Sequence, residues 1–102
     1  HCDALPKEML PGMVAVQRLR DAVLARAVIR ALDEAGGPVA VITGNGHARR
    51  DWGVPAVLAE VAPDLDVWVL GQTEDGRPLE GGFDTVKSAP AAQRPDPCAA
   101  FQ

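Results

Sequence analysis

Tyrosine is absent from this chain of 102 residues, serine occurs once, and only two histidines, His1 and His47, can titrate near neutral pH. The single serine, Ser88, lies in a segment rich in proline and alanine that contains no nucleophile-elbow motif. A serine-hydrolase triad is therefore not expected.

The chain also lacks an excess of positive charge, because 10 Lys and Arg residues stand against 14 Asp and Glu residues and the formal net charge is -4. Proteins that bind nucleic acids usually present a basic face to the phosphates, so no nucleic-acid partner is expected. Long apolar runs are missing too. None approaches the roughly 18 residues of a membrane-spanning helix, and no signal-peptide pattern is present.

Cysteine is scarce and occurs only at Cys2 and Cys98, near the two ends of the chain. A disulfide between them would close a loop of nearly the whole chain, worth roughly 4 to 5 kcal/mol in the chain-entropy model. It would also indicate an oxidising compartment. Two free thiols are the alternative, and the spacing alone does not decide between them.

The length allows one domain with one modest core. Apolar spacing predicts a long amphipathic helix from Met13 to about Ala35, ended by Gly-Gly-Pro at 36–38. Apolar runs at 39–43 and 67–70 predict two buried parallel strands, with a helix at 54–61 between them. The predicted fold class is therefore α/β, in which a short parallel sheet with a βαβ unit packs against a long amphipathic helix.

The last third of the chain is less regular. Residues 83–87 predict a short edge strand, and residues 88–102, with three prolines, predict an irregular tail. We therefore expect residues 1–102 to form a single domain.

Three polar residues, Gln17, Arg20 and Asp21, project onto the apolar stripe of the long helix at spacing i, i+3, i+4. Polar groups there must be paired or face a cavity, because burying an unpaired charge is costly. Two interpretations stay open: a structural network that anchors a loop, or the polar floor of a ligand site.

The loop GNGHARRDWG at 44–53 follows the first predicted strand, at the strand end where parallel sheets bind ligands. The glycines on either side of Asn45 are expected to take positive φ and form a sharp turn that projects His47 and Arg49 above the sheet. His47 suits a metal or haem-iron ligand or a general base, and the arginines favour an anionic group. The alternative is an Asn-Gly turn whose histidine bonds a carbonyl while the arginines are solvated.

Four segments together resemble the ChaN-like haem-binding lipoproteins of bacteria. They are HCDALP at the start, QRLRDAVLA at 17–25, VITGNGHARRDWGVP at 41–55 and PDPCAAF at 95–101. That group is associated with iron and haem uptake, and its superfamily also contains the Tiki proteases and the erythromycin esterases. The GNGH segment with Arg49 and the Q-x-x-R-D helix are the most specific parts of the resemblance.

The resemblance implies that Gln17, Arg20, Asp21, His47 and Arg49 line one cofactor site, to which Asn45 of the same loop also belongs. His47 is the candidate metal ligand, and Arg49 and Arg20 are candidate partners for haem propionates or other carboxylates.

Members of the family are usually longer, so the chain is expected to be the C-terminal part of a larger α/β fold. In the family, haem is thought to lie between two protomers with a tyrosine on the iron, whereas this chain has no tyrosine. Three possibilities stay open: His47 binds the iron, the ligand lies outside this sequence, or this relative binds no haem.

The resulting hypothesis is a haem-binding module of a bacterial envelope protein, periplasmic or lipid-anchored when intact, that takes part in haem or iron uptake. Its ligand would be haem or another tetrapyrrole. The alternative is an enzyme, a hydrolase or metal-dependent peptidase of the Tiki or erythromycin-esterase type that needs the missing N-terminal half.

The resemblance also favours a disulfide between Cys2 and Cys98, because two cysteines flanking one domain of a secreted protein are readily explained as a staple. A homodimer is expected as well, since a partial α/β domain leaves apolar sheet surface to be covered.

Overall fold

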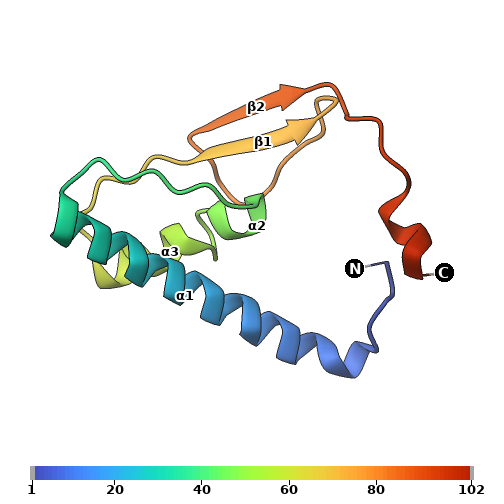
Figure 1. Ribbon diagram of the computed structural model, residues 1–102, viewed down its shortest axis with the longest axis horizontal. Coiled ribbons are helices and arrows are strands. Elements are labelled where there is room, and N and C mark those ends of the chain that lie inside the picture. Colours follow the sequence, from blue (N-terminus) through green and yellow to red (C-terminus); the bar gives the residue numbers. More distant parts are fainter. Residues whose placement is uncertain (1, 102) are drawn as a thin grey trace.

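The computed structural model describes residues 2–101 and has a mixed α/β fold, as predicted. The helix α1 runs along one side of the molecule and the strands β1 and β2 along the other, with α2 and α3 between them in the view of Figure 1. The elements in chain order are η1 (Lys7–Met9), α1 (Leu10–Ala35), α2 (Asn45–Ala48), α3 (Val54–Val61), β1 (Leu70–Glu74), β2 (Thr85–Ala89) and η2 (Pro97–Phe101), where η denotes a 3-10 helix.

The long helix α1 begins at Leu10, three residues before the predicted start, and ends at Ala35 as predicted. Pro11 lies in its first turn, where the missing N–H has no intrahelical partner to lose. Gly36 ends the helix with a φ of 76°, and its N–H donates to the carbonyl of Leu32 at 2.9 Å. The stop signal read from the sequence is therefore confirmed.

The core lies where α1 packs against α3. Ala25 of α1 and Val54 and Leu58 of α3 are buried there. The helix α3 has the predicted bounds, with Pro55 in its first turn. Partly buried apolar residues surround these three: Leu24, Val28, Ile29, Val57, Leu65 and Val67.

The sheet has two parallel strands, paired from Leu70 with Thr85 to Glu74 with Ala89. The strand predicted at 67–70 therefore shares only Leu70 with β1, and the edge strand predicted at 83–87 lies two residues further on. The Asp84 carboxylate accepts the N–H of Val69 at 2.6 Å, so a side chain takes the place of a ladder partner just before β1 begins. The predicted irregular tail correspondingly starts inside β2 and ends in η2.

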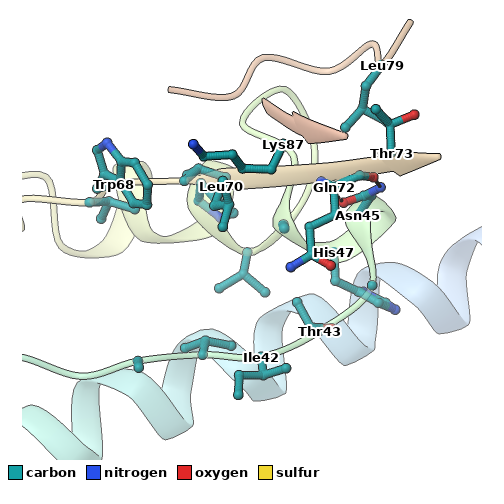
Figure 2. A pocket seen from close by; sticks show the side chains of 18 of the residues that line it. Ile42, Thr43, Asn45, His47, Trp68, Leu70, Gln72, Thr73, Leu79 and Lys87 are labelled. Carbon is teal, nitrogen blue, oxygen red and sulfur yellow. Dashed lines mark hydrogen bonds between the residues drawn. The ribbon is translucent and has the colours of Figure 1, made fainter. Parts of the chain in front are cut away.

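The first predicted strand is not part of the sheet. Residues 39–43 run as an extended segment (Figure 1) that forms no β-ladder with other described residues. Residues 66–69 form none either. The parallel pair expected between these two segments is therefore not formed, and both segments line a groove of about 1410 Å³ (Figure 2).

A disulfide between Cys2 and Cys98 joins the two ends of the described chain, with a Cα–Cα distance of 5.3 Å. It ties the segment before α1 to η2, so the pairing favoured by the family resemblance is present in the structure.

Arg50 and Asp84 connect the loop after α2 to the approach to β1. One guanidinium nitrogen of Arg50 donates both to the Val67 carbonyl at 2.6 Å and to the Asp84 carboxylate at 2.5 Å. The hydrogen bond from Arg50, together with that from the Val69 N–H, lowers the pKa of Asp84.

This lowered pKa predicts a loss of stability in acid. A carboxyl whose folded pKa is depressed stabilises the fold above its unfolded pKa of about 3.9, and this contribution disappears as the pH falls through the folded pKa. Urea midpoints measured between pH 7 and pH 2.5 should therefore fall below about pH 4. They should fall less steeply in an Asp84→Asn variant; equal slopes in the two proteins would show that Asp84 makes no such contribution.

Candidate functional site

Asp21 and His47 form the polar centre of the candidate site. Asp21 lies on α1 with only 3% of its surface exposed, and its Oδ1 is 2.6 Å from Nδ1 of His47. A carboxylate buried in this way needs a partner, and His47 is the one that the structure provides. Asp21 therefore holds the loop at 44–48 through His47.

His47 reaches Asp21 because residues 44–48 form a single helical turn. The N–H groups of His47 and Ala48 both donate to the carbonyl of Gly44, at 3.0 and 3.2 Å. Gly44 has a φ of -70°, and Gly46 is not among the residues with positive φ. The prediction of a sharp Asn-Gly turn with glycines at positive φ is therefore wrong. As a consequence His47 faces α1, where the sequence had suggested a projection above the sheet.

The pairing fixes the roles of the two ring nitrogens. A carboxylate can only accept, so Nδ1 of His47 carries the proton and Nε2 keeps its lone pair in the neutral ring. Nε2 has no hydrogen-bond partner among residues 2–101, and 24% of the side chain is exposed. His47 can therefore offer Nε2 to a metal or to a proton. The other histidine, His1, lies outside the described residues.

Asn45 and Gly53 hold the helical turn in place. The Asn45 side chain donates to the carbonyl of Gln72 at 2.5 Å and accepts the N–H of the same residue at 3.1 Å, which fastens α2 to the edge of β1. Gly53 is buried, and a Cβ there would collide with the His47 carbonyl. The structure thus gives Asn45 a contact with the strand, and the close approach at Gly53 requires a glycine.

Arg49 is engaged by its own loop. Its guanidinium makes two parallel bonds to Asp51, at 2.5 and 2.6 Å, and lies 3.5 Å from the centre of the Trp52 ring. The hydrogen bond between Arg49 and Asp51 raises the pKa of the Arg49 guanidinium and lowers the pKa of the Asp51 carboxyl. The pair orients Trp52, since the indole is covered on one face by the guanidinium.

A cavity of about 680 Å³ opens beside the Asp21–His47 pair. Its walls come from the N-terminal half of α1 on one side and from the segment 46–52 on the other. The lining residues are Met13, Val14, Gln17, Arg18, Asp21, Gly46, His47 and Trp52.

The cavity contains three of the residues proposed from the sequence, Gln17, Asp21 and His47. Arg20 is exposed on α1 and does not line it, while Asn45 and Arg49 are bonded elsewhere as described above.

Arg18 also lines the cavity and was not among the residues proposed from the sequence. Val14, Gln17, Arg18 and Asp21 follow the spacing i, i+3, i+4, i+7 and share one face, which could have revealed it.

Two further observations concern the described part of the chain. No group of three or more His, Cys, Asp or Glu side chains comes together as a metal site within residues 2–101. Over the same residues, none of the helices combines the length and the apolar character needed to cross a membrane.

Comparison with known families places the chain. A family model described as haem-binding uptake, Tiki superfamily, ChaN, matches residues 1–58, more than half of the sequence. The chain belongs to this family. The matched part includes Asp21, His47 and Trp52, whereas the PDPCAAF segment at 95–101 lies outside it.

Membership of this ChaN family indicates a role connected with haem in general. The comparisons found no similar protein of curated function and no similar solved structure.

Proposed function

We propose that this ChaN-family chain binds haem, or a closely related tetrapyrrole, in the cavity beside Asp21 and His47, and that Nε2 of His47 is its iron ligand. The observation that carries the proposal is the hydrogen-bonded Asp21–His47 pair on the wall of an otherwise largely apolar cavity. The protein would act in haem or iron uptake.

The residues of the cavity fit such a group. Cofactor pockets usually measure about 300–1,000 Å³ and are mainly apolar with a few placed polar groups, and this cavity of about 680 Å³ is of that kind. Met13, Val14 and Trp52 provide apolar and aromatic surface for a flat macrocycle. Arg18, the cation among the lining residues, is available to a propionate.

Asp21 and His47 have separate tasks in this proposal. Haem supplies an iron that accepts a nitrogen ligand. Asp21 holds the proton on Nδ1, fixes the orientation of the ring and makes Nε2 a stronger electron donor. This arrangement provides a ligand in a chain that has no tyrosine.

The setting of the protein follows from other features. The Cys2–Cys98 disulfide is typical of an oxidising compartment, which supports a place in the periplasm or the cell envelope. The cavity is open, since Val14 and Trp52 on its walls are exposed. A second protomer could cover this opening, so a homodimer remains part of the proposal.

Tryptophan fluorescence tests where the haem binds. Trp52 lines the cavity, whereas Trp68 lines a groove between residues 39–44 and β1 that shares only His47 with the cavity. Hemin titrated into the oxidised chain should quench the emission, and a Trp68→Phe variant should keep most of the quenching. A Trp52→Phe variant should lose most of it; the reverse pattern would place hemin outside the cavity.

No specific observation favours the alternative, a hydrolase or peptidase of the same superfamily. Both thiols are joined in the disulfide, and the Ser88 hydroxyl accepts a hydrogen bond from the N–H of Gly76 at 2.8 Å. A metal-dependent reaction would need donors beyond the Asp21–His47 pair, from outside the described residues.

A further inference from the structure

The connection between β1 and β2 holds the segment that carries Trp52, a lining residue of the cavity proposed for haem. The N–H of Arg50 donates to the Gly82 carbonyl at 3.1 Å. The N–H of the next residue, Asp51, donates to the Gly81 carbonyl at the same distance of 3.1 Å. Two successive glycines thus hold the backbone beside the cavity, and they lie outside the part of the chain that the family model matches.

Gly81 also leaves the space that the Arg49 side chain occupies. It has a φ of 118°, a value that residues with a side chain rarely adopt. A Cβ added to Gly81 would lie 2.7 Å from Cβ and 2.9 Å from Cζ of Arg49. Both distances are below the roughly 3.5 Å at which two carbon atoms pack. Because Cβ of Arg49 is fixed by its backbone, a different rotamer of Arg49 cannot relieve the overlap.

Arg49 carries this contact on to Trp52. Its guanidinium carbon lies 3.5 Å from the centre of the indole ring, and only 18% of the Arg49 side chain is exposed. Trp52 itself is 60% exposed, so its indole has few other contacts with the described chain. Gly81, Arg49 and Trp52 therefore form a continuous series of contacts that ends at the wall of the cavity.

We propose that Gly81 is a positioning residue of the candidate haem site: because it has no side chain, Arg49 can lie against Trp52 and hold the indole in place on the cavity wall. This role rests on the function proposed above, in which Trp52 packs against a flat macrocycle. Aromatic pairs depend on the relative orientation of their rings, and a side chain that is already ordered loses less entropy on binding. Arg49 thus acts on the ligand through Trp52.

Near-ultraviolet circular dichroism of Trp52, measured without hemin, tests the contact itself. In a Trp68→Phe parent chain Trp52 is the only tryptophan, so the indole bands report on it alone. Gly81→Ala in this parent should weaken the bands at least about 2-fold, because an indole that is no longer packed gives little near-ultraviolet signal. Arg49→Ala should weaken them to the same extent.

Gly76→Ala is the matched control. Gly76 also has a positive φ, of 67°, but a Cβ there meets no atom within 4 Å. This variant therefore introduces similar backbone strain without a collision and should keep the Trp52 bands of the parent.

The double variant Gly81→Ala/Arg49→Ala should lose no more of the bands than either single variant, because both substitutions break the same series of contacts. Unchanged bands in Gly81→Ala, shown to be folded by far-ultraviolet circular dichroism, would overturn the proposal. An equal loss in Gly76→Ala would overturn it as well. Should Gly81→Ala not fold, unchanged bands in Arg49→Ala would be the contradicting result.

Hemin titration of the same variants tests the role of the contact in the site. Gly81→Ala should bind hemin roughly 3- to 10-fold more weakly than the parent, the effect expected from one aromatic pair. Gly76→Ala should bind it as the parent does. Loss of the Trp52 bands with unchanged hemin affinity would overturn the role of Gly81 in the site. A parent that binds no hemin would refute the proposed function and with it this role, while the bands measured without hemin would still show whether Gly81 positions the indole.

Discussion

Replacing Cys2 and Cys98 together by serine is expected to lower the free energy of unfolding by about 4 to 5 kcal/mol. The two residues are 96 positions apart, so the disulfide closes a loop that includes nearly the whole chain and restricts the unfolded ensemble strongly. The folded core is small, with Ala25, Val54 and Leu58 at its centre, and domains of this size have little stability to spare.

Urea unfolding followed by circular dichroism measures this loss. The wild-type chain in reducing agent should unfold at the same urea concentration as the double-serine variant, and reducing agent should not affect the variant. A difference below about 1 kcal/mol between oxidised and reduced wild-type chain would show that the loop-closure account fails here. It would then be the packing of α1 against α3 that holds the fold.

The second large effect is expected at the Asp21–His47 pair. His47→Ala should cost about 2 to 4 kcal/mol of unfolding free energy, because it leaves the carboxylate of Asp21 buried without a partner. Asp21→Ala removes the buried charge as well as the bond, so the double variant should be less destabilised than the sum of the two single variants. The expected coupling is about 1.5 to 3 kcal/mol.

Arg20→Ala is the matched control for this cycle, because Arg20 precedes Asp21 on α1 but is exposed. Its effect should stay within about 0.5 kcal/mol. Strictly additive losses for Asp21→Ala and His47→Ala would mean that the 2.6 Å contact does not stabilise the chain in solution. The role assigned to Asp21 in holding His47 would then fail.

The helices could be predicted because their signals are local. Gly36 ends α1 and Pro55 begins α3 wherever the rest of the chain lies, since each acts through its own backbone torsions. The strands could not be placed in the same way, because a ladder depends on a distant partner. The N–H of Val69 donates to the Asp84 side chain, and the strand β1 begins at the next residue, Leu70.

The sequence predicted some of the residues that line the candidate cavity, but it did not predict how they contact one another. The spacing on the long helix indicated that Gln17 and Asp21 face inward, and the GNGH segment indicated His47 as the reactive group. The bond between Asp21 and His47 joins positions 26 residues apart and depends on how the turn at 44–48 folds, which no local pattern specified. Arg49 was assigned to a ligand because its pairing with Asp51 and Trp52 was not visible in the sequence.

The central claim is that Nε2 of His47 binds the iron, and imidazole rescue of a His47→Ala variant tests it most directly. Hemin added to the wild-type chain should give a sharp Soret band typical of a nitrogen ligand, and the variant, once shown to be folded by circular dichroism, should give a weak, broad one. Free imidazole should restore the wild-type band in the variant, because it can occupy the space left by the ring. An unchanged band in the folded variant without imidazole would contradict the claim.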